Sequence, residues 1–268
     1  MPVEAGRQCR GKLWSNLKEV CDLLHIPFNV SLAYTELLFQ HVQFRPGQRI
    51  HTAGQKFVSL CIVNSGFLKT ASIDELGHEQ VHHFPMKGDV LGVECICTKR
   101  YSSETVALSD CNIIFLPFQK LAALGHAHVE FENAIYSLLS RELIRKQAMV
   151  NMLSAFNAET RVARFLVSLS ERYAEIGYSK TMFNLQMTRQ EIGSYLGLSL
   201  ETVSRTLSAL NEIGLISVDQ RAIWIKHLDK LKMLRRLPVS TLHARQVKSG
   251  KLQVGANWSH AVPGSLVN

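Results

Sequence analysis

The chain has 268 residues, of which 46% are hydrophobic, so it is long enough for one or two domains with buried cores. It contains no apolar run of the roughly 18 residues that a transmembrane helix needs. Its first residues, MPVEAGRQCRGKLW, lack an apolar signal segment. We therefore expect a cytoplasmic protein without a membrane partner. In that compartment its six cysteines are expected to be thiols or ligands, not disulfides.

The net charge of +8 is concentrated at the C-terminal end. Residues 1–220 carry 21 basic and 21 acidic side chains, which cancel, whereas residues 221–268 carry nine basic side chains and one acidic. Such a local surplus favours contact with the phosphates of a nucleic acid. Residues 238–268 have little periodicity and are predicted to be a disordered basic tail, for which a role in solubility alone is the alternative.

An N-terminal segment, residues 1–25, precedes the first predicted domain. Its apolar spacing predicts a short helix over residues 13–24, which ends before Pro27. A second helix is predicted over residues 31–41, where apolar side chains cluster.

Residues 26–125 are predicted to form a β-roll. From Val42 onward, short β-type runs alternate with glycine-containing turns, such as those at Gly47, Gly54 and Gly88. Many short strands separated by turns are typical of barrels and jelly rolls.

Residues 126–155 are predicted to form one long dimerisation helix, because their apolar positions follow a coiled-coil repeat. The predicted dimer seam consists of Ile135, Leu139, Leu143, Lys146, Val150 and Leu153. A seam that begins at Tyr136 fits as well. Lys146 falls in either seam, and two facing lysines would weaken the dimer, which predicts conditional dimerisation.

Residues 156–237 are predicted to form a DNA-binding domain built on a helix-turn-helix. A helix over residues 159–176 comes first. Thr188 and Glu191 then form a capping-box pattern at the start of a short helix, which ends at Gly197.

The second helix of the motif is predicted to begin after Ser199, whose hydroxyl can cap it. Its apolar face consists of Val203, Leu207, Leu210 and Ile213, and its polar face of Glu201, Ser204, Arg205 and Ser208. Two short strands within residues 214–225 are predicted to form a hairpin, which would be the wing of a winged helix-turn-helix.

The segment MTRQEIGSYLGLSLETVSRTLSALNEIGLI resembles the DNA-binding domain of the Crp–Fnr superfamily of bacterial transcription regulators. It is most similar to the branch of the fumarate and nitrate reduction regulator, through E-T-V-S-R at residues 201–205. A weaker resemblance covers residues 26–234, where VQFRPGQRIHTAGQ is similar to a cyclic-nucleotide-binding β-roll. The resemblance implies an α+β fold with this β-roll, a long dimerisation helix and a C-terminal winged helix-turn-helix.

The resemblance also implies a homodimeric transcription regulator, an activator or a repressor, whose partners are double-stranded DNA and RNA polymerase. Arg205 would contact guanine in bidentate fashion, Glu201 would accept from a base amino group, and Ser204 would touch a neighbouring base. Contacts to the DNA backbone are expected from Thr188, Arg189, Ser199, Thr202 and Arg221. Leu200 stands where cyclic-AMP-type members have arginine, which favours TTGAT-like half-sites over TGTGA-like ones.

The β-roll departs from the pattern of cyclic-AMP-binding members. Val93 stands where those members have a glutamate for the ribose, and Ser102-Ser103 replaces an Arg-Ser pair that neutralises the phosphate. A buried phosphate without a paired cation is unfavourable, so the sequence disfavours cyclic AMP and predicts no cofactor.

Cluster-bearing relatives hold an iron–sulfur cluster on three N-terminal cysteines and one cysteine of the β-roll. Here His25 stands at the third N-terminal position, and the position of the β-roll cysteine falls at Ile114. No metal site is predicted. The alternative function is an oxygen or redox sensor whose cluster uses the atypical ligand set Cys9, Cys21, His25 and Cys111.

The sequence has no phosphate loop, nucleophile elbow or zinc-protease motif, which disfavours an enzyme. A nucleoid-type protein that binds DNA without sequence preference is the third hypothesis, beside the regulator and the redox sensor. It would bind its operator and random DNA with similar affinity.

Overall fold

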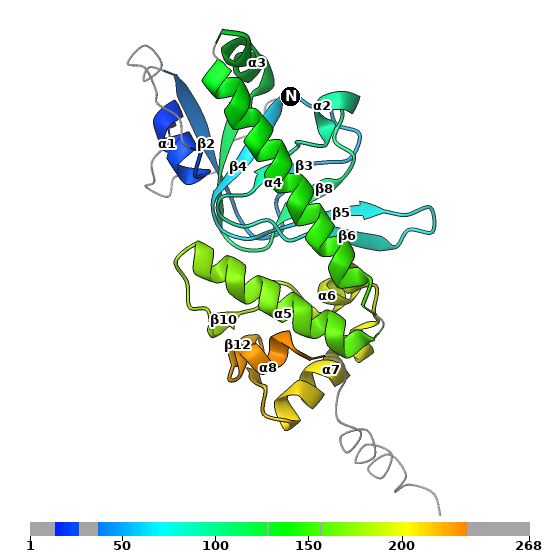
Figure 1. Cartoon of the computed structure of the whole chain (residues 1–268). Helices are drawn as coiled ribbons and strands as arrows, with labels where there is room; N and C mark the ends of the chain where they lie inside the picture. Colours follow the sequence, from blue (N-terminus) through cyan, green and yellow to red (C-terminus); the bar gives the residue numbers. More distant parts are fainter. Residues whose placement is uncertain (1–13, 27–36, 128, 156, 235–268) are drawn as a thin grey trace, which may run out of the picture.

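The computed structural model describes residues 14–26, 37–127, 129–155 and 157–234. The β-roll lies at one end, the long helix α4 runs along it, and the helix-turn-helix lies at the other end (Figure 1). The predictions for Cys9 and for the tail 238–268 fall outside the described residues. None of the helices within these ranges is both long and apolar enough to cross a membrane.

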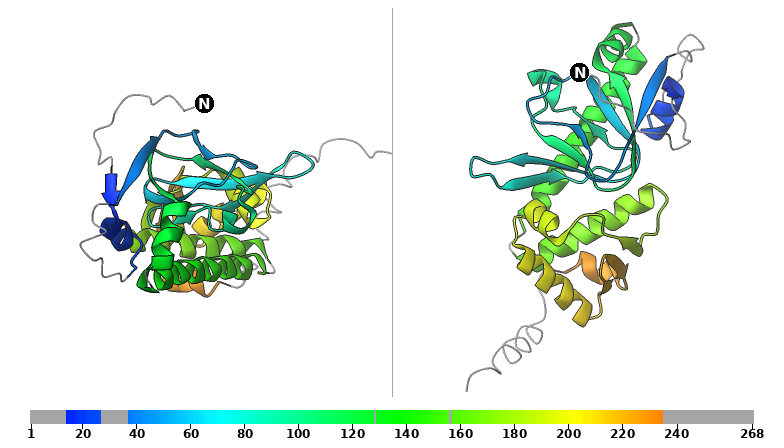
Figure 2. Two further views of the ribbon diagram at one scale, coloured as in Figure 1. Left: turned by 90° about the horizontal axis from the view of Figure 1, so that it is seen from above. Right: turned by 180° about the vertical axis from the view of Figure 1, so that it is seen from behind.

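The β-roll contains two antiparallel sheets, as the glycine-punctuated pattern predicted. One sheet has the strand order β1-β2-β9-β4-β7 and the other the order β3-β8-β5-β6. From behind, the β5–β6 hairpin projects sideways from the roll (Figure 2). The strands are β1 Trp14–Asn16, β2 Leu38–Phe44, β3 Arg49–His51, β4 Ser59–Ser65, β5 Leu68–Ile73, β6 Glu79–His83, β7 Val90–Leu91, β8 Glu104–Ala107 and β9 Cys111–Pro117.

The helices cover one side of the roll and build the C-terminal part. They are α1 Leu17–Leu23, α2 Cys95–Thr98, α3 Phe118–Ala127, α4 Val129–Leu153, α5 Ala158–Glu175, α6 Arg189–Leu196, α7 Leu200–Glu212 and α8 Leu228–Lys232. A third sheet, of order β10-β12-β11, contains β10 Met182–Asn184, β11 Ile216–Asp219 and β12 Ala222–Ile225. The α+β fold with a C-terminal winged helix-turn-helix is confirmed.

The helix predictions in the N-terminal part are wrong at two places. Residues 14–16 form strand β1, and the predicted helix begins only after Asn16, whose side chain accepts from the backbone N–H of Glu19. Residues 38–41 belong to strand β2, in which the buried side chains of Phe39 and His41 alternate with exposed neighbours. The strand exists because it pairs with β9, far along the chain, which local apolar spacing does not reveal.

A long helix is present near the predicted place, but its start differs. Residues 126 and 127 belong to α3, which passes through Gly125 without ending, and α4 then spans the 25 residues Val129–Leu153. The following helix α5 begins after Asn157, whose side chain accepts from the backbone N–H of Thr160. This cap fixes where α5 starts.

The roll and the helix-turn-helix share one apolar cluster. Phe84, which follows β6, contacts Phe165 of α5 and Tyr195 of α6, with ring centroids 6.2 Å and 5.2 Å away. Val81 and Met86 of the roll are buried in the same cluster. Burial of this much apolar surface holds the DNA-binding part against the sensor part in this structure.

Candidate nucleic-acid interface

The first helix of the motif, α6, begins with the capping box that the sequence predicts. The backbone N–H of Glu191 donates to the Thr188 hydroxyl at 3.1 Å, and the backbone N–H of Thr188 donates to the Glu191 carboxylate at 2.7 Å. These bonds satisfy two N–H groups that a helix start otherwise leaves without partners. Thr188 is exposed and lies at a helix N-terminus, where a phosphate is electrostatically favoured.

The turn between the two helices depends on two glycines. Gly197 ends α6 in the left-handed conformation, with a φ of 64°, as predicted. Gly193, inside α6, was not singled out from the sequence. A Cβ there would lie 2.6 Å from the carbonyl oxygen of Leu198, so only glycine lets the turn pass this close to the helix.

The second helix, α7, is the candidate recognition helix. Ser199 caps it by accepting from the backbone N–H of Thr202 at 3.2 Å. Val203, Leu207 and Leu210 are buried as predicted. The amphipathic pattern therefore fixes which face of α7 points outward.

That outward face presents Glu201 and Arg205, which are both exposed, together with the partly exposed Ser204. A hydrogen bond from its own backbone amide and one from Ser199 lower the pKa of the Glu201 carboxyl. Glu201 is therefore a hydrogen-bond acceptor at neutral pH. The Arg205 guanidinium donates to the Thr202 hydroxyl at 3.4 Å, within the first turns of the helix.

The wing is the β11–β12 hairpin, and Arg189 connects it to α6. The Arg189 guanidinium donates to the carbonyl oxygen of Gln220, at the wing tip, at 3.0 Å. Arg189 is partly buried, and burial lowers its pKa. Arg221, next to Gln220, is exposed and donates to the carbonyl oxygen of Gln186 at 3.4 Å. Arg189 thus positions the wing, while Arg221 presents the more accessible charge.

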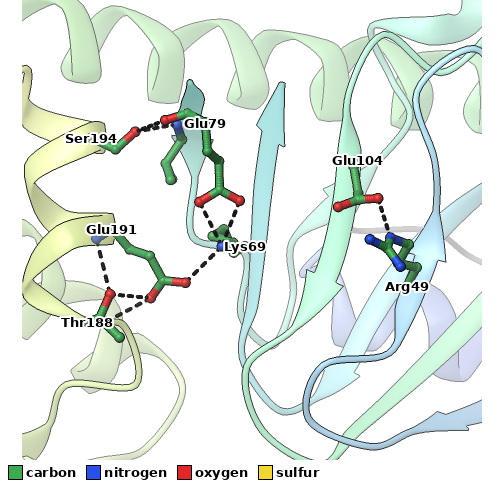
Figure 3. A network of polar contacts seen from close by, with 8 residues as sticks. Arg49, Lys69, Glu79, Glu104, Thr188, Glu191 and Ser194 are labelled. Atoms are coloured by element: carbon green, nitrogen blue, oxygen red, sulfur yellow. Dashed lines mark hydrogen bonds and ion pairs between the residues drawn. The ribbon is translucent and has the colours of Figure 1, made fainter. Parts of the chain in front are cut away.

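The opposite side of α6 is bound to the edge strand β6 of the roll (Figure 3). The Lys69 ammonium lies 2.8 Å from carboxylate oxygens of both Glu79 and Glu191. The Ser194 hydroxyl donates to the carbonyl oxygen of Glu79 at 2.7 Å and accepts from the backbone N–H of Val81 at 2.9 Å. Because a side chain of α6 satisfies backbone groups of β6, this sheet edge is protected from pairing with another strand.

Glu191 therefore has two tasks, since it caps α6 and binds the roll. Burial opposes ionisation of its carboxyl, but the bonds from Lys69 and from the Thr188 N–H hold its pKa below the ordinary value. Lys69 was not a candidate from the sequence, where nothing distinguishes it from other lysines of strand-forming segments.

A second link between the parts centres on Asp89, which is 2% exposed. Its carboxylate binds Arg145 of α4 at 2.7 Å and also binds Arg172 of α5. Arg172 donates in addition to the carbonyl oxygen of Phe84 at 3.1 Å. Burial of the Asp89 carboxyl opposes ionisation, but Arg172 and Arg145 hold its pKa below the ordinary value. One carboxylate thus joins the roll, the long helix and the DNA-binding part.

A cavity of about 660 Å³ lies between the roll, α4 and α5, and Ser102 and Ser103 line it. Its arginines, Arg145 and Arg172, are those that bind Asp89. Four carboxylate side chains also line it: Glu94, Glu142, Glu171 and Glu175. Lys146, His82 and His83 also line the cavity. This lining does not fit the phosphate of a cyclic nucleotide, because both arginines are paired with Asp89 and the four carboxylates would repel an anion.

The described candidate ligands of an iron–sulfur cluster are not brought together. Cys21 of α1 and Cys111 of β9 are buried in separate apolar clusters, and His25 is exposed. Burial raises the pKa of the Cys21 thiol to about 11 and also raises that of Cys111. Within the described ranges, no three His, Cys, Asp or Glu side chains are grouped as a metal site. The described candidates do not fit a cluster because they lie apart in this structure, and the fourth candidate, Cys9, lies outside the described residues.

Comparison with known proteins agrees with this architecture. Residues 160–234 match the Crp-like helix-turn-helix domain, and residues 41–128 match the cyclic nucleotide-binding domain. The transcriptional regulatory protein btr of Bordetella pertussis is 34% identical over 218 residues, which cover 81% of this chain and 90% of the relative. The fumarate and nitrate reduction regulatory protein of Escherichia coli is 36% identical over 188 residues, 70% of this chain and 75% of the relative.

Solved structures give the same result. FixK2 from Bradyrhizobium japonicum aligns with a TM-score of 0.68 at 25% identity, covering 75% of this chain and 100% of that structure. TTHB099, a regulator of the CRP family from Thermus thermophilus, aligns with a TM-score of 0.60 at 20% identity, covering 74% of this chain and 98% of that structure. These relatives are regulators of transcription, not enzymes. The chain belongs to the Crp–Fnr family of DNA-binding transcription regulators.

Proposed function

We propose that the protein is a homodimeric, sequence-specific regulator that reads a TTGAT-like inverted repeat with α7. The observation that carries this proposal is the polar outer face of α7, where Glu201 and Arg205 are exposed on one side of a helix whose other side is buried. A bidentate contact from arginine to guanine and a carboxylate that accepts from a base amino group are the direct readout that this face offers.

The half-site preference rests on Leu200, which is 44% exposed at the start of α7. An apolar side chain there cannot make the guanine contact that arginine makes in relatives of the cyclic-AMP type, but it can contact a thymine methyl group. We therefore expect TTGAT-like half-sites to bind more tightly than TGTGA-like half-sites.

Contacts to the DNA backbone are proposed for the residues that flank this face. Thr188, Ser199 and Thr202 lie at helix N-termini, where backbone N–H groups and hydroxyls can donate to phosphate oxygens. Arg221 would reach the phosphates from the wing. Arg189 would act there mainly by holding the wing tip, because its guanidinium already donates to Gln220.

Dimerisation is proposed through α4. Tyr136, Leu143 and Val150 recur every seven residues and are 57%, 69% and 58% exposed, which is a coiled-coil spacing on an open face. Leu153, which both seams share, packs against a cluster of its own chain. Ile135, the residue that distinguishes the other seam, also packs within its own chain. The seam that begins at Tyr136 is therefore favoured. A dimer would read half-sites about one helical turn apart and would act on RNA polymerase at the promoter.

The test is a binding series at one salt concentration with a TTGAT palindrome, a TGTGA palindrome and random duplex DNA. We expect Arg205→Ala to weaken binding to the TTGAT palindrome by roughly 1–3 kcal/mol and to relax selection at one base pair. Lys120→Ala is the matched control, since it removes one exposed positive charge from α3, at the opposite end of the molecule (Figure 1). An equal loss of affinity for all three duplexes in Arg205→Ala would contradict base readout by Arg205. Equal affinity of the wild type for all three would contradict sequence-specific binding.

A further inference from the structure

A second cavity, of about 210 Å³, lies between α1, the roll and the α3–α4 pair. None of the residues that line this cavity belongs to the DNA-binding face. The lining of the α1 side is deeply buried, with Leu17, Val20 and Leu24 no more than 3% exposed. The α1 side of the cavity is thus deeply buried, whereas Ala122, Leu138 and Leu139 on the α3–α4 side are partly exposed.

The lining is apolar throughout. No lining residue carries a charged, amide or hydroxyl side chain, and no polar surface faces the space. A water molecule needs two to four polar partners, which the described lining does not offer. An engineered apolar cavity of about 150 Å³ in another protein stays dry and binds benzene or xenon. The present cavity is larger, so a substituted benzene ring is within its capacity.

The only sulfur of the described lining belongs to Cys21. Burial raises its pKa to about 11, so it faces the cavity as a neutral thiol. Ile114, at the position where the family resemblance places a cluster ligand, is buried in the same apolar cluster as Cys21. This region therefore offers apolar contacts and is not suited to a charged inorganic group.

The place of the cavity connects the N-terminal helix to the long helix. Ile135, Leu138 and Leu139 of α4 line it from one side and α1 from the other. The Arg141 guanidinium of α4 donates to the carbonyl oxygen of Leu24 at 2.5 Å, which ties the end of α1 to α4 beside the cavity. Lining atoms of an empty cavity lack dispersion partners, so an occupant would strengthen the contact between these helices.

We propose that this cavity is a binding site for a small, uncharged, apolar molecule about the size of a substituted benzene ring. Its occupancy stabilises the packing of α1 against α4. A charged or strongly polar ligand is excluded, because it would lose its hydration without gaining a partner.

Toluene is the probe, and the thermal unfolding of the full-length protein is the measurement. At ten times its dissociation constant, toluene is expected to raise the Tm of the wild type by about 3 °C. Ala122→Phe should abolish this rise, because Ala122 lines the cavity and a phenyl ring would fill it. Ala123→Phe is the matched control, since Ala123 is the exposed neighbour on the same helix. It should keep the full rise.

A wild type whose Tm does not respond to toluene would overturn the proposal. An equal rise in both alanine variants would do the same, because binding would then lie elsewhere. If Ala122→Phe fails to fold, Val93→Phe fills the cavity from the roll and carries the same expectation. A further readout is hydrogen exchange, which toluene should slow in the amides of α1 in the wild type and in Ala123→Phe.

Discussion

The guanidinium of Arg172 in α5 binds the carboxylate of Asp89 in the β-roll, in a pair that is almost completely closed to solvent on the Asp89 side. Arg145 of α4 binds the other oxygen of the same carboxylate. The orientation of the DNA-binding part relative to the roll and to the long helix is therefore set in part at one side chain. Any signal that moves α4 or α5 has to rearrange this contact.

Removal of Asp89 should destabilise the protein strongly. Asp89→Ala leaves two guanidinium groups facing each other without their shared partner, and we expect a loss of about 3–5 kcal/mol in the free energy of unfolding. Arg172→Ala should cost less, because Arg145 still neutralises the carboxylate. Urea unfolding followed by circular dichroism measures both.

Glu171→Ala is the control: its ion pair with Lys232 is about 40% exposed on both sides, so its loss should change stability by less than about 1 kcal/mol. Equal effects of Asp89→Ala and Glu171→Ala would contradict this role of Asp89.

The Lys69–Glu191 pair should matter more than the Arg49–Glu104 pair, although Lys69 and Arg49 lie in strands of the same sheet (Figure 3). The Lys69 and Glu191 side chains are 13% and 14% exposed, whereas those of Arg49 and Glu104 are 63% and 32% exposed. We expect Lys69→Ala to lower stability by about 2–3 kcal/mol and Arg49→Ala by at most about 1 kcal/mol.

The same Lys69 variant should also loosen α6 from β6. Hydrogen exchange of the Val81 amide, which donates to Ser194 of α6, reports this contact directly. We expect faster exchange at Val81 in Lys69→Ala and an unchanged rate in Arg49→Ala. An unchanged rate in both variants would mean that the apolar cluster alone holds the two parts together.

Lys146→Leu should tighten the dimer. Lys146 is exposed on α4 between Leu143 and Val150, on the face proposed to pair with a second copy. Replacing a charge in a coiled-coil seam by leucine removes repulsion between the two copies and adds apolar contact. Sedimentation equilibrium should show a lower dimer dissociation constant for Lys146→Leu and no change for Lys120→Leu, the control on α3. An unchanged constant for both would argue against this seam.

His51 should make stability depend on pH. It is 5% exposed, its Nε2 hydrogen-bonds Thr105, and burial lowers its pKa from 6.5 to about 4. Between those two values the unfolded chain takes up a proton that the folded protein does not. Stability from this group is therefore complete above pH 6.5 and is lost as the pH falls toward 4.

The matching variant is His51→Phe, which keeps a ring that can stack on Tyr101 and cannot titrate. Between pH 7 and pH 5 the wild type should lose about 2 kcal/mol more stability than His51→Phe, as measured by urea unfolding. The same loss in both proteins would show that His51 does not contribute to the pH dependence.

The helix-turn-helix could be predicted because its contacts are local. The capping box of Thr188 and Glu191, the left-handed Gly197 and the Ser199 cap each join atoms within four residues along the chain, so residue type and spacing alone specify them. The polar face of α7 followed from helical periodicity for the same reason.

Strand β2, the contacts of Asp89 and the apolar cavity could not be predicted in this way. Arg172 and Asp89 are 83 residues apart in the sequence, and Ser194 and Glu79 are 115 apart. Whether such side chains meet depends on how whole sheets and helices pack, and no local pattern marks them. The amino-acid sequence by itself determined that this chain carries a winged helix-turn-helix behind a β-roll. Only the tertiary structure decided how the two are joined, because long-range packing selects those contacts from many that local chemistry allows.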